Sequence, residues 1–251
     1  MRNCDAVILA AGRGERMGEL ARDCPKCLLP LNGPEKSCLL GLQLRALQQE
    51  GIDRVIVVTG WKDKLVEDYI MRNWPGEAVF VHNHRYHRTN TATSLLMALD
   101  HTAAEVALVM NADVFFHPSI LRGLCNYEHP SAMVVRPAAC SDEEVKVILS
   151  ETGQVLAVGK GLDPNRSFGE YIGVSKFSKE DRHVLREALS STVRYDENAY
   201  FEDALNSVLH LLDVRAYRAE KPCIEVDYPS DFFEAQCILR ILAKEDVFPW
   251  K

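Results

Sequence analysis

The stretch that decides the fold is AVILAAGRGERMG, residues 6–18. Its first five residues are apolar and lead into a glycine-rich segment, which is the pattern of a buried β-strand followed by a turn. Glycines let backbone N–H groups approach a ligand closely, and successive N–H groups in such a turn can surround phosphate oxygens. Arg16 lies within the stretch and Lys26 follows it in a Pro-Lys pair. Both supply positive charge suited to a triphosphate, so the pattern predicts a phosphate-binding loop.

Outward from this stretch, apolar strands alternate with amphipathic helices. Strands are expected at 54–59, 78–81 and 106–110, and helices at 37–50, 62–73 and 93–101. Such alternation is typical of a parallel sheet with helices on both faces. We therefore predict an α/β fold, a Rossmann-like three-layer sandwich with a mostly parallel mixed sheet.

The second half of the chain is less regular. Short strands are expected at 133–136, 145–149, 155–158, 214–217 and 224–226, and helices at 179–190, 199–211 and 230–243. We find no repeat, low-complexity stretch or linker in the 251 residues. Chains of this length with an α/β pattern commonly form one domain, so we predict a single domain with an elaborated C-terminal half.

Composition excludes several functional classes. The net charge is −7, with 36 acidic against 29 basic residues, which disfavours binding to a nucleic-acid backbone. No apolar run approaches the roughly 18 residues of a membrane span, and the first apolar run leads into a Gly-Arg loop instead of a cleavage site. Eight irregularly spaced cysteines suit reduced thiols. We expect a cytoplasmic protein, a monomer or homodimer, that neither binds nucleic acid nor inserts into a membrane.

Two better-known glycine motifs do not fit the loop. A Walker loop ends in Gly-Lys-Ser/Thr, which is absent after Gly12 and Gly14. A dinucleotide fingerprint needs its third glycine three residues after the second, whereas Gly18 comes one position later. A pair of glycines alone would be an ordinary strand-to-helix turn. The added Arg16 and Lys26 favour a nucleotide site.

Two aspartates follow apolar strands. Asp113 comes after the strand at 106–110, and Asp227 comes after Ile224 to Val226. Ligands of open α/β sheets bind at the carboxyl ends of strands, and carboxylates there offer the hard oxygens that Mg²⁺ binds together with phosphates. Each aspartate alone could instead cap the next helix or turn. The pair, taken with the glycine loop, predicts a Mg²⁺ site, whereas Asp5, Asp53 and Asp231 are expected to be surface or capping residues.

Histidine and cysteine clusters also suggest metals. His82 and His84 would share one face of a strand, and His87 follows, but no further ligand has suitable spacing. Cys24 and Cys27 have thioredoxin-like spacing but lie in the phosphate loop, without a second pair for zinc. The sequence therefore disfavours zinc or redox chemistry at either place.

These motifs resemble the nucleotidyltransferase superfamily that activates sugar phosphates and choline phosphate, and within it the bacterial choline-phosphate cytidylyltransferase-like branch. The matching blocks follow in the family's order at 9–17, 25–26, 83–86, 89–90, 94–95, 111–113, 145–147, 159–160, 169–173 and 225–231. The resemblance implies transfer of CMP from CTP to a phosphorylated small molecule, with Mg²⁺ on Asp113 and Asp227. The residues themselves do not exclude UTP. The nucleotide-binding half would span about 1–115 and the acceptor-binding half about 116–251.

Residue roles follow from this resemblance and from charge. Arg16 and Lys26 are the predicted catalytic residues, with Arg16 on the β- and γ-phosphates and Lys26 on the α-phosphate. The predicted nucleotide-binding residues are Leu9, Ala10, Ala11, Gly12, Gly14, Asn83, Thr89, Asn90 and Ser94. Asn83 and Asn90 could equally be loop caps.

The acceptor is predicted from two segments, 168–171 and 200–203, where aromatic rings stand beside carboxylates. Such a mixture suits a cationic head group, although strand alternation would place some of these rings in the core. The expected acceptor is an amine-bearing phosphate or phosphonate: phosphocholine, 2-aminoethylphosphonate or phosphoethanolamine. The predicted acceptor-binding residues are Lys146, Lys160, Glu170, Tyr171 and Glu202, the two lysines from the resemblance.

Other functions fit less well. A sugar- or polyol-phosphate nucleotidyltransferase using CTP or UTP is the main alternative. A nucleotide-sugar glycosyltransferase would typically carry Asp-x-Asp where this chain has Asn111-Ala112-Asp113. A non-catalytic relative would be expected to lose Lys26 or the metal aspartates, and this chain retains them.

Overall fold

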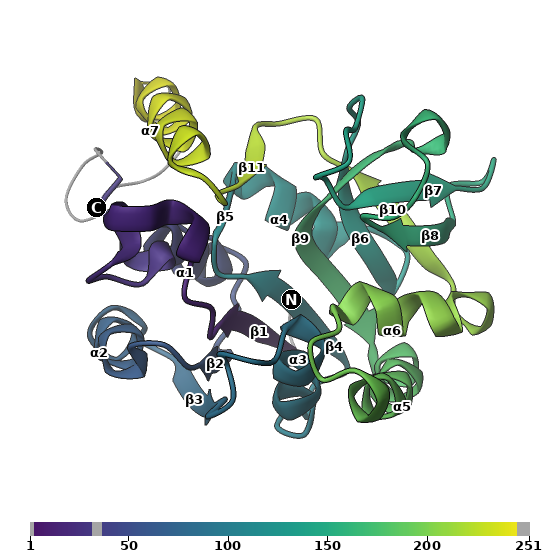
Figure 1. Ribbon diagram of the computed structural model, residues 1–251, viewed down its shortest axis with the longest axis horizontal. Coiled ribbons are helices and arrows are strands. Elements are labelled where there is room, and N and C mark those ends of the chain that lie inside the picture. The colour runs from purple at the N-terminus through teal and green to yellow at the C-terminus, as the bar shows by residue number, and fades with distance from the viewer. Residues whose placement is uncertain (1–2, 32–36, 245–251) are drawn as a thin grey trace.

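The computed structural model describes residues 3–31 and 37–244. Its centre is a mixed sheet with the strand order β10-β6-β9-β4-β1-β2-β3 (Figure 1). β1 (Cys4–Ala10) is buried along its whole length and pairs in parallel with β2 (Arg54–Thr59) and β4 (Val106–Asn111). β3 (Glu77–His82) continues the parallel half beside β2. The apolar run at the start of the chain thus forms a central strand, as predicted.

The other half of the sheet contains antiparallel pairs. β9 (Gly169–Ser178) runs antiparallel to both β4 and β6 (Ser131–Arg136), and β10 (Val214–Arg218) is parallel to β6. β7 (Lys146–Leu149) and β8 (Val155–Gly159) form a hairpin, and β7 pairs with the first residues of β9. A separate two-stranded pair joins β5 (Val114–Phe116) to β11 (Cys223–Glu225). This arrangement confirms the predicted α/β fold with a mixed sheet.

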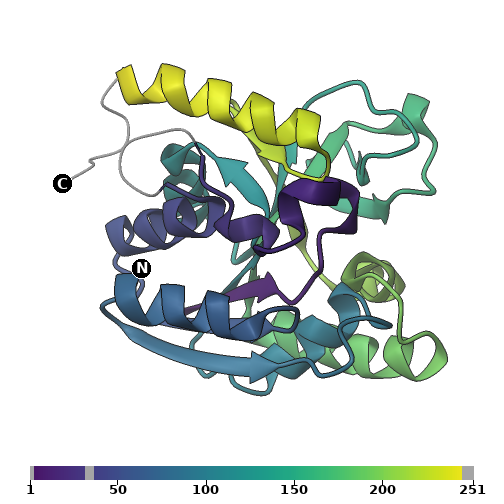
Figure 2. The same cartoon turned by 60° about the vertical axis from the view of Figure 1, so that its left-hand side comes forward.

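Helices cover both faces of the sheet. α1 (Leu39–Gln49), α2 (Asp63–Asn73) and α4 (Pro118–Asn126) share one core with β1 side chains such as Ile8, whereas α3 (Thr91–Leu99), α5 (Lys179–Tyr195) and α6 (Phe201–Val208) share the other with Val7. α7 (Pro229–Lys244) lies outside α1 and packs through Phe232 and Leu239 on a third core (Figure 2). Short 3₁₀ helices occur at Glu15–Ala21, Lys26–Leu28, Pro164–Arg166 and Leu209–Leu211.

Some elements differ from the sequence prediction. β9 was not predicted as a strand because polar residues interrupt its apolar pattern, although Ser175 and Lys176 are buried within it. β5 and α4 were also missed, and the helix predicted at 199–211 ends as α6 at Val208 before a 3₁₀ turn. These errors lie mostly in the second half, where local periodicity is weakest.

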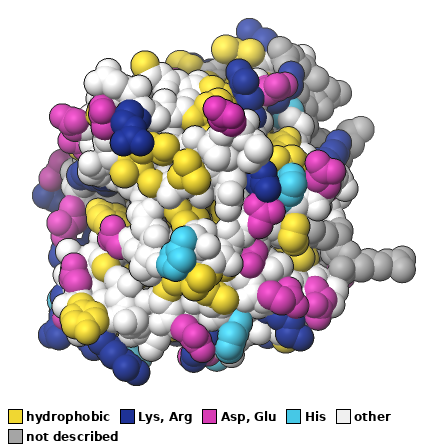
Figure 3. All heavy atoms as spheres, turned by 90° about the vertical axis from the view of Figure 1, so that its right-hand side faces the viewer, with side chains coloured by type: hydrophobic (Ala, Val, Ile, Leu, Met, Phe, Trp, Pro, Cys, Tyr) yellow, Lys and Arg dark blue, Asp and Glu magenta, His cyan; other side chains and the backbone are white. Residues whose placement is uncertain are grey.

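Charged side chains of both signs are mixed on the surface. Acidic and basic side chains are interspersed over the described part of the face in Figure 3 instead of gathering in one stripe. Within residues 3–31 and 37–244, no helix is both long and apolar enough to cross a membrane.

Asp5 is buried, contrary to the expectation of a surface position. Its Oδ2 accepts hydrogen bonds from the backbone N–H groups of Ala103 at 2.8 Å and Ala104 at 3.1 Å, and from Arg54 at 3.2 Å. Asp5 therefore provides the acceptor for backbone N–H groups of the loop before β4, which is a capping role.

Replacing Asp5 with alanine is expected to lower the free energy of unfolding by about 2–3 kcal/mol, because two buried N–H groups and a charged partner lose their acceptor. Urea denaturation measures this change. Glu77→Ala is the matched control: Glu77 contacts the same Arg54 at 2.9 Å but is largely exposed, so about 1 kcal/mol or less is expected. Equal losses in the two variants would contradict a buried capping role for Asp5.

Candidate active site

A cavity of about 390 Å³ opens at the carboxyl ends of β1 and β4. This edge is where parallel strands bring their following loops together. Leu9 to Gly12 and Gly14 line one side of the cavity, with Arg16 and Lys26 beside them. Gly14 has a left-handed backbone (φ +61°), and a Cβ there would lie 3.1 Å from the Lys26 Cβ. Glycine at 14 thus lets the loop turn back against Lys26.

A second segment that lines the cavity joins β3 to α3. Asn83 is buried, and its amide nitrogen donates to Thr89 Oγ1 at 2.9 Å and to Ser94 Oγ at 3.2 Å. Asn90 caps α3 by accepting from the N–H of Thr91 at 2.9 Å. All four predicted residues of this segment line the cavity, and Asn83 and Asn90 also hold its backbone shape.

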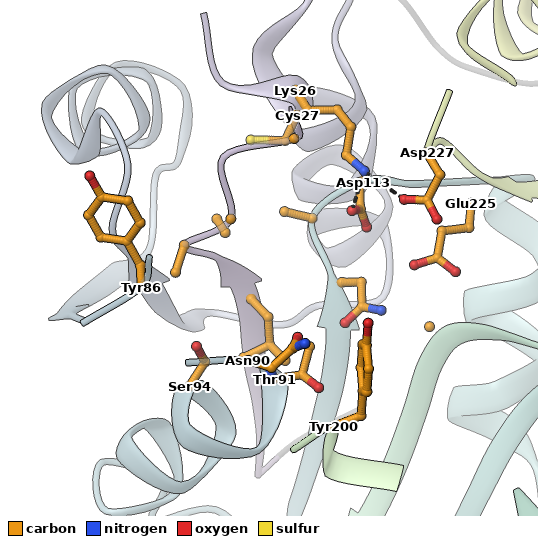
Figure 4. Close-up of a pocket in the computed structure, with 18 of the residues that line it drawn as sticks. Lys26, Cys27, Tyr86, Asn90, Thr91, Ser94, Asp113, Tyr200, Glu225 and Asp227 are labelled. Atoms are coloured by element: carbon orange, nitrogen blue, oxygen red, sulfur yellow. Dashed lines mark hydrogen bonds and ion pairs between the residues drawn. The ribbon is translucent and has the colours of Figure 1, made fainter. Parts of the chain in front are cut away.

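Lys26 lies among carboxylates (Figure 4). Its Nζ is 2.8 Å from Asp113 Oδ2 and 3.0 Å from Asp227 Oδ1. Arg16 contacts the other oxygen of Asp227 at 2.8 Å. Burial alone would favour the neutral amine, but the two aspartates outweigh it and raise the pKa of Lys26 above its usual value. The structure therefore brings together the four charged residues that the sequence assigned to phosphate and metal binding.

Glu225 is a third carboxylate in this cluster. Oxygens of Asp113, Glu225 and Asp227 lie within 4.8 Å of one another. Burial and the two aspartates raise the pKa of Glu225 to about 8. No role was predicted for Glu225 from the sequence. Its spacing of two residues from Asp227 was the available signal, because alternate residues of an extended chain share a face.

The far side of the cavity comes from the second half of the chain. Tyr171, Tyr200 and Glu202 line it together with Lys160 (Figure 4 labels Tyr200). Glu202 is buried, and its Oε2 has no hydrogen-bond partner in the described part of the chain. Burial raises the pKa of Glu202 to about 7. An unsatisfied buried carboxylate is costly, so this oxygen is a point where a ligand can be anchored.

Two predicted acceptor residues lie elsewhere. Lys146 Nζ donates to the backbone oxygens of Ser141 at 2.8 Å and Glu144 at 3.2 Å, and it does not line the described cavity. Glu170 pairs with Arg136. Alternate residues of a strand face opposite sides of the sheet, so Tyr171 faces the cavity and Glu170 faces away. Lys146 and Glu170 thus lie outside the cavity lining, and their predicted role in acceptor binding stays a prediction.

Comparisons with known proteins identify the family of the chain and proteins that resemble it. The family model described as the MobA-like NTP transferase domain matches residues 6–197. A CTP:phosphoglutamine cytidylyltransferase of Campylobacter jejuni is 24% identical, covering 90% of this chain and 97% of that protein. A 2-aminoethylphosphonate cytidylyltransferase of Lancefieldella rimae is 25% identical, covering 86% and 85%. The structure of the CTP:phosphocholine cytidylyltransferase from Streptococcus pneumoniae superposes with a TM-score of 0.77 at 22% identity, covering 94% of this chain and 99% of that chain. At 22% identity this superposition shows a similar fold and nothing further.

Proposed function

Since the chain belongs to the MobA-like NTP transferase domain family, we propose that it transfers CMP from CTP to a small amine-bearing phosphate or phosphonate and releases pyrophosphate. Two curated relatives of similar length are cytidylyltransferases, one for phosphoglutamine and one for 2-aminoethylphosphonate. The observation that carries the choice of an amine is the buried Glu202 oxygen in the cavity, which has no hydrogen-bond partner among the described residues.

The residues of the carboxylate cluster fit a divalent ion. Their donors are hard oxygens, and Asp113 Oδ1 is buried without a hydrogen-bond partner among the described residues. Asp113 and Asp227 would hold Mg²⁺, with Glu225 next to them. Bound there, Mg²⁺ would neutralise charge on the phosphates of the nucleotide.

The remaining chemistry is positioning and charge neutralisation by the chain itself. An oxygen of the acceptor's phosphate forms a bond to the α-phosphorus of CTP, the bond from that phosphorus to the β-phosphate oxygen breaks, and pyrophosphate leaves with the bonding electrons. Lys26 would contact the α-phosphate and Arg16 the β- and γ-phosphates. No general base is needed, because the attacking oxygen is already ionised near neutral pH. The base would lie against Ala10 to Gly12, Asn83 and the segment from Thr89 to Ser94.

The part of the cavity that binds the acceptor would contact its cationic and anionic groups with different side chains. Glu202 would pair with the ammonium group, and Tyr171 and Tyr200 would offer ring surface to it, which is worth about 0.5–2 kcal/mol for each ring face. Lys160 would face the anionic part of the acceptor. A cationic partner also resolves the cost of burying Glu202 as a carboxylate.

Acceptor selectivity tests this proposal. We expect kcat/KM to be at least tenfold higher for phosphocholine, phosphoethanolamine, 2-aminoethylphosphonate or phosphoglutamine than for glucose 1-phosphate or inositol 1-phosphate. Glu202→Gln should reduce that preference about tenfold or more, since a buried charge-assisted hydrogen bond contributes about 1.5–3 kcal/mol. Pyrophosphate release measures each rate.

Glu170→Gln is the matched control, because Glu170 lies outside the cavity lining and should leave the preference unchanged. Preference for a neutral-headed acceptor, or an unaltered preference in Glu202→Gln, would exclude the amine pocket. Nucleotidyl transfer itself would still stand.

The pH dependence gives a second test. Burial raises the pKa of Glu202 to about 7, so in the free enzyme the carboxyl is mostly neutral below pH 7 and ionised above it. The ratio of kcat/KM for an amine-bearing acceptor to that for inositol 1-phosphate should therefore rise with pH through about 7. Phosphocholine is the amine-bearing acceptor to use, because it and inositol 1-phosphate are both phosphate monoesters and the ionisation of the phosphate largely cancels in the ratio. In Glu202→Gln the ratio should be flat; a rise that persists there would assign the titration to another group.

A further inference from the structure

A second group of metal-binding side chains lies where β3 ends beside α2, outside the lining of the active-site cavity. Asp63 and Glu67 are one turn apart in α2, so they project from the same face of the helix. His82 is the last residue of β3, which runs alongside α2 (Figure 1). Each of the three offers a ligand atom, and these atoms lie within 4.8 Å of one another.

One distance within the cluster matches that between two ligands of a small metal ion, and Thr59 links the third residue to it. His82 Nδ1 is 3.2 Å from Asp63 Oδ2. The same Nδ1 is 3.4 Å from Thr59 Oγ1, which is in turn 3.5 Å from Glu67 Oε1. Ligand atoms of a tetrahedral zinc site, at about 2.0–2.1 Å from the ion, are about 3.3 Å apart. The His82–Asp63 pair already has this spacing, and the Glu67 oxygen, within 4.8 Å of both, would need to move closer by about an ångström or more.

The charges and exposure of the cluster also suit an ion. Two carboxylates converge on one imidazole. Lys64 contacts Glu67 through the other oxygen, Oε2, at 2.9 Å, but its side chain is 79% exposed and such a pair contributes little. Oε1 remains directed at Thr59. The Asp63, Glu67 and His82 side chains are all partly exposed, so an ion can reach them.

A further donor stands next to this group. The ring of His84 lies 4.3 Å from that of His82, centroid to centroid. The sequence alone disfavoured zinc at these histidines because no other ligand had suitable spacing; the fold supplies two, from a helix about 15 to 20 residues earlier in the chain. Mixed imidazole and carboxylate donors favour Zn²⁺ over Mg²⁺, in contrast to the all-carboxylate cluster at Asp113.

We propose that Asp63, Glu67 and His82 form a site for Zn²⁺ or a similar first-row transition ion, with His84 as an adjacent imidazole. The ion would join α2 to the end of β3. Asn83 follows His82 directly, and its backbone N–H donates to Thr59 O at 2.8 Å. The site would therefore brace the start of the segment from Asn83 to Ser94. It does not depend on the proposed acceptor or nucleotide.

The test is Zn²⁺ binding to the full-length protein after removal of metals with a chelator. Competition with a chromophoric zinc indicator should show one tight site per chain that excess Mg²⁺ does not displace. Co²⁺ bound there should give the visible absorption of a tetrahedral nitrogen and oxygen environment. His82→Gln and Glu67→Gln should each weaken Zn²⁺ binding at least tenfold, and Zn²⁺ should raise the melting temperature of the parent protein but not of these variants.

Two controls separate this site from others. His183 forms an exposed pair with Glu187 at 3.5 Å on α5, so His183→Gln should bind Zn²⁺ like the parent. Asp113→Asn should also retain the site, since it alters only the active-site cluster. The proposal is wrong if the parent binds no Zn²⁺, if affinity is unchanged in both His82→Gln and Glu67→Gln, or if Zn²⁺ is lost only in Asp113→Asn. Because the two variants alter different elements, misfolding of one, recognised by circular dichroism, leaves the other as the test.

Discussion

Replacing Lys26 with alanine is expected to lower kcat about a hundredfold while the chain still folds. Lys26 contacts both strand-end aspartates, and its ammonium group is mostly buried in the cavity. A preorganised charge that contacts the reacting phosphate typically contributes about 3 kcal/mol to the transition state. Steady-state pyrophosphate release with saturating CTP measures the loss.

The control for this variant is Lys64→Ala, which removes a lysine that is 79% exposed and pairs only with Glu67 among its described contacts. It should leave kcat within about twofold of the parent. If Lys26 serves mainly to neutralise Asp113 and Asp227, its loss would lower the melting temperature and spare turnover. A Lys26→Ala enzyme with more than half the parent kcat would therefore refute the catalytic assignment. A KM for CTP that rises far more than kcat falls would limit Lys26 to ground-state binding.

The first half of the fold was predictable because its strands are apolar runs that the sheet buries on both faces. β1, β2 and β4 were expected at the right places, and their parallel pairing brings residues 9–14 and Asp113 to one edge. β9 was not predictable in this way. It is a central strand, but Glu170, Ser175 and Lys176 are buried within it and break the apolar pattern. Two of them find partners in other segments of the chain: the Tyr127 oxygen accepts from Lys176 at 2.7 Å, and Arg136 pairs with Glu170.

The residues of the candidate site likewise divide into those predicted from local sequence patterns and those whose position depends on tertiary contacts. Lys26, Asp113 and Asp227 were predicted from local patterns, a loop and two strand ends, and the structure joins them. Lys146 was predicted from a short block of resemblance and Glu170 from the mixture of rings and carboxylates at 168–171, and neither pattern says which side of a strand faces the cavity. Glu202 was expected, but that its Oε2 has no partner within residues 3–31 and 37–244 depends on tertiary structure, which no local pattern contains.

The hydrogen-bond partners of Asp231 indicate that its carboxylate has a capping role. Its Oδ2 accepts from the backbone N–H groups of Asp227 at 3.0 Å and Tyr228 at 2.8 Å, which is the capping role that the sequence suggested. Asp113 differs, because one of its oxygens contacts Lys26 and the other has no hydrogen-bond partner within the described residues. A capping aspartate uses its oxygens on backbone groups, and Asp113 leaves one available.

Asp113→Asn and Asp227→Asn are each expected to lower turnover about a thousandfold or more, and EDTA should abolish activity until Mg²⁺ is restored. A divalent ion contributes several kcal/mol to the stabilisation of charge on a phosphoryl group, and an amide is a much weaker ligand than a carboxylate. The substitution keeps the size of the side chain, so the cavity and fold should survive.

Asp100→Asn is the control: Asp100 pairs with Arg186 on the surface and should give parental activity with the same EDTA sensitivity. Each variant is compared by kcat and by melting temperature, because a purely structural carboxylate would lower stability and leave turnover near the parent value. Activity that persists in EDTA, or an Asp113→Asn enzyme that is less stable yet nearly fully active, would show that these aspartates do not hold a catalytic ion.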